Sequence, residues 1–130
     1  MKRKRNDAGN SHVAPVHKLH IRLDFGGRVA LGPGKVRLME LIAENGSITA
    51  AGRAMAMSYR RAWLLAEEIN AAFAEPLIVT QAGGRGGGGA TLSDRGRDII
   101  ERYRRIEATT LAANGADIAA VKKALREKAG

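Results

Sequence analysis

The chain has 130 residues, of which 45% are apolar, a size and composition that suit one ordinary domain with a single core. Lys and Arg number 22 against 13 acidic residues, so the formal net charge is +9 and an anionic partner is expected. The lack of cysteine excludes disulfides, thiolate metal sites and cysteine nucleophiles. No apolar run has the length that a membrane span needs, and the N-terminus lacks the apolar segment of a secretory signal, so a cytoplasmic location is expected.

The N-terminal part predicts a basic arm followed by a β-hairpin. Residues 1–17 are polar and basic, with four consecutive cations from Lys2 to Arg5, and we expect them to form a disordered arm. From Leu19 to Phe25 apolar and polar residues alternate, which is typical of a half-buried strand. Gly26-Gly27 then predicts a turn into a short returning strand that ends at Leu31.

The next segment predicts three helices. The first begins at Pro33, which suits a first helical turn, and ends near Asn45. A short second helix is capped by Ser47 or Thr49, and a tight turn leads to a third helix from Tyr59 to Ala74 that Ser58 caps. This order of a helix, a short helix, a tight turn and a further helix is typical of a helix-turn-helix domain.

A glycine-rich stretch, Gly83 to Gly89, lies between two short strands predicted at residues 77–80 and 90–92. It contains a formal G-x-G-x-x-G, but a dinucleotide loop leads directly from a strand into a helix, and here a strand intervenes. The P-loop pattern fails as well, because Ala90 and Thr91 stand where Lys and Ser or Thr are required. We therefore interpret the stretch as the tip of a basic wing, with a plain flexible connector as the alternative. Arg85 and the backbone of Gly84, Gly86 and Gly87 are its candidate contacts with a sugar-phosphate chain.

The C-terminal part predicts one long helix and one short basic helix. Ser93 caps the long helix, whose apolar seam extends over several turns, and Asn114-Gly115 interrupts it. A basic amphipathic segment from Asp117 to Lys128 predicts the last helix. The expected organisation is a disordered basic arm (1–17), a winged helix-turn-helix domain (18–112) and a basic amphipathic helix or tail (113–130). The predicted fold class is mainly α with a small β-hairpin wing.

In winged helix-turn-helix domains the third helix of this order enters the major groove of DNA with its N-terminal residues leading. This places Ser58, Tyr59, Arg60 and Arg61 at the groove, where an Arg fork can bind guanine or a phosphate. A solvated helix face is the alternative for the two arginines, and a ring packed on the neighbouring helix is the alternative for Tyr59. Trp63 is interpreted as structural. Five aromatic residues are too few for a single-strand stacking surface, so duplex DNA is the favoured partner.

No catalytic or metal-binding constellation is predicted. The three histidines include His20, which alternation places with Asp24 on a solvent face, and a structural zinc site needs about four nitrogen or sulfur ligands. No histidine is paired with a serine in a recognisable nucleophile motif. We therefore expect no enzymatic activity, no cofactor and no bound metal.

Two motifs carry a resemblance to a known family. Residues 42–57 are similar to the helix-turn-helix of LysR-type regulators, which is a common pattern. More specifically, Ser58-Tyr59-Arg60-Arg61-Ala62-Trp63 and the stretch from Gly83 to Leu92 resemble the recognition helix and wing of the ModE family of molybdate-responsive transcriptional regulators. Arg85 stands where the family has lysine, so the positive charge is kept. The resemblance extends from about Leu19 to Tyr103.

The resemblance implies a homodimeric, nucleoid-associated regulator that binds a palindromic operator in double-stranded DNA. It also implies that the long C-terminal helix contributes to the dimer, with Ile99, Tyr103 and Ile106 of its apolar seam as the candidate contacts. Thr49 is a further candidate DNA-binding residue. The family continues into paired β-barrel domains that bind molybdate, whereas this sequence ends at Gly130. Three ways of regulating this chain stay open. It acts without a ligand, relies on a separate molybdate-binding protein, or forms a heterodimer with a full-length relative. An adaptor that pairs with another regulator without reading DNA is the alternative function.

Overall fold

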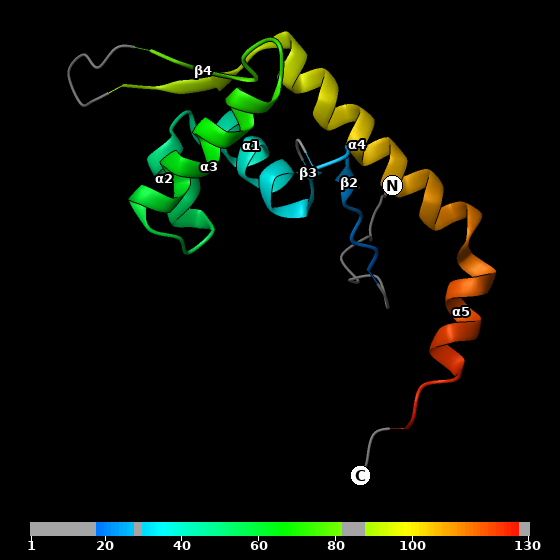
Figure 1. Ribbon diagram of the computed structural model, residues 1–130. Helices are drawn as coiled ribbons and strands as arrows, with labels where there is room; N and C mark the ends of the chain where they lie inside the picture. The colour runs from blue at the N-terminus through cyan, green and yellow to red at the C-terminus, as the bar shows by residue number, and fades with distance from the viewer. Residues whose placement is uncertain (1–17, 28–29, 82–87, 128–130) are drawn as a thin grey trace, which may run out of the picture.

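The computed structural model describes residues 18–27, 30–81 and 88–127, and these form a mainly α, winged-helix fold with an N-terminal hairpin (Figure 1). Two antiparallel strand pairs flank the helices, and each pair makes its own two-stranded sheet. The fold class predicted from the sequence is therefore confirmed. In chain order the elements are β2 (Leu23–Asp24), β3 (Ala30–Leu31), α1 (Pro33–Asn45), α2 (Ile48–Ala54), α3 (Tyr59–Ala72), β4 (Ile78–Thr80), β5 (Ala90–Leu92), α4 (Asp94–Ala113) and α5 (Gly115–Lys123).

Serine side chains define where three of the helices begin. The Oγ atoms of Ser47, Ser58 and Ser93 accept hydrogen bonds from backbone N–H groups three residues later, at 3.0, 3.1 and 3.0 Å. Each bond satisfies a donor that has no partner inside its helix. Of the two caps considered for α2, Ser47 is the one used, and this leaves the side chain of Thr49 on the first turn of the helix.

The turn between α2 and α3 brings the two helices of the helix-turn-helix into close contact. Ala56 has a φ of 57°, and the N–H groups of Ala56 and Met57 donate to the carbonyls of Arg53 and Gly52, both at 3.0 Å. This pair of bonds is the Schellman termination of a helix, with alanine at the left-handed position that glycine usually occupies. The chain can then reverse direction within four residues, between Ala54 and Tyr59.

The core lies where α1, α3 and α4 converge on the two small sheets. Among the described residues, the core contains no buried charged side chain, and its one buried hydroxyl, that of Tyr103, has a hydrogen-bond partner. That hydroxyl donates to the backbone carbonyl of Ile21, so α4 holds the N-terminal segment against the body. The core residues are Leu31, Val36, Leu38, Met39, Leu41, Ile42, Ile48, Ala51, Ala62, Leu65, Ala66, Ile69, Leu77, Ile78, Ala90, Leu92 and Tyr103.

The root of the wing hairpin, β4 and β5, is fixed to the helix-turn-helix by polar contacts. Asn70 of α3 accepts hydrogen bonds from the N–H groups of Leu77 and Ile78, at 2.9 and 3.0 Å, and donates to the carbonyl of Ile78 at 2.8 Å. On the other strand, the N–H of Ala90 donates to the carbonyl of Gly46, between α1 and α2, at 2.9 Å. The direction in which the wing leaves the body is therefore set by α3 and by the α1–α2 turn.

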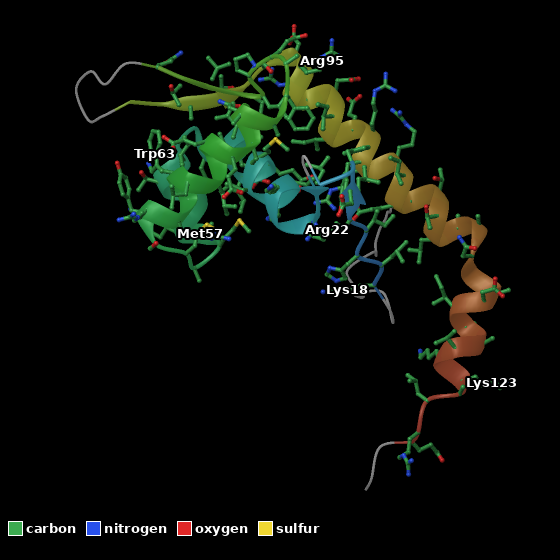
Figure 2. All side chains as sticks on the ribbon, viewed as in Figure 1. Lys18, Arg22, Met57, Trp63, Arg95 and Lys123 are labelled. Atoms are coloured by element: carbon green, nitrogen blue, oxygen red, sulfur yellow. The ribbon has the colours of Figure 1, made fainter. Side chains whose placement is uncertain are left out.

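The two C-terminal helices leave the body on the side away from α2 (Figure 1). Figure 2 shows Trp63 and Met57 at one end of the molecule and Lys123 of α5 at the other. No residue of α5 is buried. The last helix was expected from Asp117 to Lys128, but α5 begins two residues earlier, because the Asn114-Gly115 break is itself its start, and it ends at Lys123. Within the described part of the chain, no helix combines the length and apolarity needed to cross a membrane.

Candidate nucleic-acid interface

The N-terminus of α3 presents a group of exposed polar and basic side chains. Tyr59, Arg60 and Arg61 are all exposed, Tyr59 by 64%, and Ser58 caps the helix beside them. The first turn of α3 contains no acidic residue that would neutralise the arginines. Unpaired N–H groups and the positive end of the helix dipole lie at the same place, so this end of α3 favours an anionic partner.

The two arginines face different surroundings because consecutive helical residues differ by about 100° in direction. Arg60 lies opposite the buried face of α3, in an outer stripe that continues with Leu64 and Glu67 at helical spacing. Arg61 instead lines a hollow of about 420 Å³ together with Arg22, from the N-terminal hairpin, and Lys35 of α1. Arg60 therefore points away from the protein, and Arg61 belongs to a basic edge.

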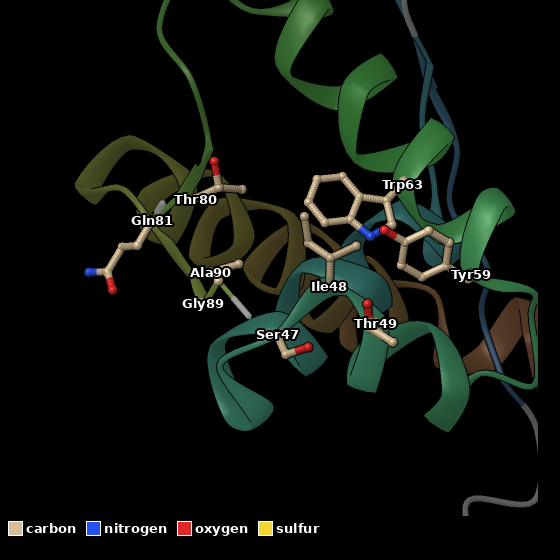
Figure 3. Close-up of a pocket in the computed structure, with 10 residues that line it drawn as sticks. Ser47, Ile48, Thr49, Tyr59, Trp63, Thr80, Gln81, Gly89 and Ala90 are labelled. Atoms are coloured by element: carbon tan, nitrogen blue, oxygen red, sulfur yellow. The ribbon is translucent and has the colours of Figure 1, made fainter. Parts of the chain in front are cut away.

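A second hollow, of about 510 Å³, lies between the start of α2, the start of α3 and the wing root (Figure 3). Hydroxyl and amide groups on its walls can donate hydrogen bonds to an oxygen-rich ligand. The hollow thus joins the start of α3 to the wing root in one continuous surface. Its lining residues are Ser47, Ile48, Thr49, Tyr59, Trp63, Thr80, Gln81, Gly88, Gly89 and Ala90.

Tyr59 and Trp63 form an aromatic pair on one side of this hollow. Their ring centroids are 6.1 Å apart with an interplanar angle of 50°, which is a tilted arrangement. In Figure 3 the indole nitrogen of Trp63 is turned toward Tyr59. Among the described residues, Trp63 Nε1 is the one buried side-chain nitrogen or oxygen atom without a hydrogen-bond partner. The ring of Tyr59 therefore packs on its own helix, whereas the packing alternative from the sequence was a neighbouring helix.

The structure brings together some of the predicted residues on the two helices and separates others. Thr49 and Tyr59 share the hollow beside the wing root, whereas Arg60 lies on the outer stripe of α3 and Arg61 lines the other hollow. The predicted wing contacts, Arg85 with the backbone of Gly84, Gly86 and Gly87, lie outside the described residues. Gly88 and Gly89, which are described, line the hollow at the wing root.

One of the three predicted dimer contacts requires a correction. Tyr103 is 1% exposed, and its hydroxyl is engaged with Ile21, so its side chain has no surface to offer a second copy. The apolar seam of α4 turns toward the chain's own core at this position. Ile99 is partly buried against the core, and Ile106 is 38% exposed and available to a partner.

Several residues of this surface were not predicted from the sequence. Thr80 and Gln81 reach the hollow only because Asn70 and Gly46 fix the wing root, and Arg22 and Lys35 reach Arg61 only through the packing of the hairpin and α1. No spacing along the chain links these positions. In the described part of the chain, no group of three His, Asp or Glu residues is placed to hold a metal ion.

No family model matches the chain, but curated proteins do. It is 42% identical over 85 residues to a molybdenum transport protein ModE of Azotobacter vinelandii, which covers 65% of this chain and 32% of the relative. It is 32% identical over 108 residues to the molybdenum-pterin-binding protein MopA of Rhodobacter capsulatus, covering 81% of this chain and 41% of that protein. It is 35% identical over 71 residues to the DNA-binding transcriptional dual regulator ModE of Escherichia coli K12, covering 55% of this chain and 27% of that protein.

The chain thus spans roughly a third of the length of the curated relatives that it matches. These relatives are named as regulators and as transport or pterin-binding proteins. The matches agree with the resemblance carried by the recognition-helix and wing motifs. Over the matched residues the chain is therefore similar to ModE transcriptional regulators, the family that its two motifs resemble.

Proposed function

We propose that this chain is a sequence-specific, double-stranded DNA-binding module of a transcriptional regulator. The observation that carries the proposal is the exposed pair Arg60 and Arg61 at the start of α3, in a turn without acidic residues whose Tyr59 lines a hollow that leads to the wing. An α-helix fits the major groove with its N-terminal residues leading, and this end of α3 concentrates positive charge. DNA bound in this way would place the protein at the nucleoid.

The two arginines have different roles in this proposal. Arg60 faces outward, where its planar fork can reach O6 and N7 of a guanine in the major groove. Arg61, beside Arg22 and Lys35, binds a phosphate of the flanking backbone. Ser58 keeps its hydroxyl proton for a phosphate oxygen while its oxygen caps α3, and Thr49 offers a hydroxyl from α2.

The wing extends the same surface along the DNA. Arg85, the cation of the glycine-rich stretch, supplies a phosphate contact, and Gly84, Gly86 and Gly87 allow backbone N–H groups to approach the sugar-phosphate chain without a side chain in between. The hollow lined by Thr49, Tyr59 and the wing root then faces the DNA strand between helix and wing.

We further propose that the module acts as a homodimer on a palindromic operator. The α4–α5 arm, residues 94–123, is the dimerisation element, with Ile106 and the partly buried Ile99 on its seam. A twofold axis between two arms presents two α3 helices, and a palindromic site is the DNA counterpart of that symmetry. A heterodimer with a full-length relative would use the same arm.

The experiment is selection of bound sequences from a random duplex pool with the purified chain, followed by titration of the selected site across salt concentrations. Arg60→Ala is expected to weaken binding by about 1 to 3 kcal/mol and to relax the preference at one base pair. Arg61→Ala and Arg85→Ala are expected to weaken selected and random duplexes alike and to lower the salt slope by about 1 each.

The matched control is Arg102→Ala, which removes one exposed arginine that pairs with Asp98 on α4, away from α3. It is expected to leave site preference unchanged. Failure of the pool to yield any preferred sequence, or variants of Arg60, Arg61 and Arg85 that all bind like the parent, would rule out the assignment.

The second candidate function is an adaptor that pairs with another regulator without reading DNA. The observation that favours it is the exposed apolar surface of the arm region, where Val121 and Leu125 are 68% and 67% exposed. An adaptor would lose partner binding when Ile106 is replaced by a charged residue and would show no change on replacement of Arg60. The DNA-binding module is the better supported function, because an adaptor gives no reason for arginines at the start of α3.

A further inference from the structure

Leu64 is a large apolar side chain on the outer face of α3, and it is 42% exposed. The apolar residues that form the core face of this helix are Ala62, Leu65, Ala66 and Ile69. Helical geometry directs Leu64 away from that group and into the same outer stripe as Arg60, four residues earlier, and Glu67, three residues later. The core therefore leaves a substantial part of this side chain exposed.

The spacing within the stripe matches the spacing of base pairs. Four residues of α-helix advance about 6 Å along the helix axis. Successive base pairs are about 3.4 Å apart. If Arg60 reaches a base pair from α3, then Leu64 reaches a position within about two base pairs of it.

In the major groove one apolar group distinguishes the bases, the 5-methyl group of thymine, and aliphatic side chains recognise it by contact. We propose that Leu64 is a specificity-determining residue that packs against the methyl group of a thymine within two base pairs of the guanine bound by Arg60. The inference rests on the proposed DNA-binding function and specifies one element of the site that is read.

The neighbours of Leu64 favour DNA over a protein partner. Exposed charges lie one turn to each side of it, Arg60 before and Glu67 after, so this part of α3 offers one isolated apolar side chain. The centre of a protein–protein interface is depleted in charged residues and buries several apolar groups together. A single leucine between polar groups instead suits the floor of the major groove, where one methyl group lies among hydrogen-bonding base edges.

The test replaces each thymine of the selected duplex in turn by deoxyuridine, which deletes the 5-methyl group and leaves the hydrogen-bonding edges unchanged. Burial of one such carbon corresponds to a change in Kd of roughly fourfold. The parent chain is expected to lose about this factor at one thymine in each half-site. Leu64→Ala is expected to bind the thymine and deoxyuridine duplexes equally, at the weaker affinity, because the contact is already absent.

Leu125→Ala is the matched control, since it truncates an equally large exposed leucine beyond α5 and is expected to keep the parent's sensitivity to the methyl group. Far-ultraviolet circular dichroism of Leu64→Ala checks that the helices are intact. The inference is overturned if the parent is insensitive at every thymine, if Leu64→Ala keeps the same sensitivity, or if the selected site has no thymine within two base pairs of a guanine. Specific binding would still be observed in those cases, whereas failure of the proposed function would abolish specific binding itself.

Discussion

Gly52 is the residue that lets α2 and α3 pack as closely as they do. A Cβ atom built at this position would lie 2.5 Å from the Cβ of Ala62, well inside the contact distance of two carbon atoms. Gly52→Ala is therefore expected to destabilise the fold by about 1 to 3 kcal/mol through overpacking, although alanine is the better helix former. Urea denaturation followed by circular dichroism measures the change.

Gly34→Ala provides the matched control, since Gly34 also lies in a helix but a Cβ there meets nothing within 4 Å. It is expected to be neutral or to stabilise the chain by up to about 1 kcal/mol. A double variant, Gly52→Ala with Ala62→Gly, removes the close pair and should recover part of the loss. Equal stability of Gly52→Ala and the parent would show that the two helices separate freely.

Residue-level features divide into those that the sequence predicts and those that depend on tertiary packing. The serine caps were predicted correctly, because a cap acts on its own helix within three residues. The left-handed backbone conformation of Ala56 was not predicted, because glycine is the residue that usually marks such a position in a sequence. Tyr103 was placed in a dimer seam because an apolar stripe has the same spacing whether it faces the core or a second subunit.

At the level of elements, a cluster of charged side chains holds α4 against α1. Arg104 donates from Nε and Nη2 to the two carboxylate oxygens of Glu40, at 2.8 and 2.7 Å, and from Nη1 to Glu107 at 2.7 Å. A two-pronged arginine–carboxylate pair fixes orientation as well as distance. This pair therefore sets the direction in which α4 leaves the body, and with it the start of the arm.

The same pair predicts a pH-dependent contribution to stability. The hydrogen bonds from Arg104 lower the pKa of Glu40 below its ordinary value of 4.5, against the opposing effect of burial. Because the folded-state pKa is depressed, the stabilisation is fully present above the ordinary value and is lost as the pH falls through the folded-state pKa. Glu40→Gln is thus expected to cost about 1 to 2 kcal/mol at neutral pH, and this difference from the parent should shrink in acid.

The free energy of unfolding of parent and variant, measured by urea titration at a series of pH values, checks this expectation. Glu44→Gln is the matched control, because the Glu44 side chain is 62% exposed and its carboxylate lies 3.7 Å from one cation of the described residues, Arg37. It should change stability by less than about 0.5 kcal/mol throughout. A cost of Glu40→Gln that stays constant through the acid range would contradict an origin in the ionised pair.

The order of elements was predictable because each one is encoded locally. Caps, helical periodicity and strand alternation identified the order of the elements from β2 to β5, although the first strand, expected over residues 19–25, is limited to Leu23–Asp24. The attachment of the wing root to α3 was not predictable, since it depends on Asn70 reaching the backbone of Leu77 and Ile78 across a turn. For the same reason the exposed residues at the start of α3 could be named from the sequence, but the hollow that joins this helix to the wing root could not.

At the scale of the whole molecule, the proposed DNA-reading surface and the arm lie at opposite ends (Figure 1). Tyr59, Arg60 and Arg61 are at the start of α3, while the exposed apolar residues Ile106 and Val121 are on α4 and α5. This separation allows two copies to join through their arms without covering the reading surface. Affinity for DNA and self-association should therefore respond to different substitutions.

The separation leads to a prediction for the double variant Ile106→Glu with Val121→Glu. Charge at two exposed apolar positions of the arm opposes its burial between subunits, so the variant should shift from dimer to monomer in sedimentation velocity. It should lose affinity for a palindromic duplex because the two half-sites are no longer bound together. Binding to an isolated half-site should decrease much less, since the DNA-reading surface is unchanged.

Ala112→Glu, at an exposed position about 120° around α4 from Ile106, is the matched control and should stay dimeric. A double variant that remains dimeric and binds the palindrome like the parent would place the subunit contact elsewhere on the molecule.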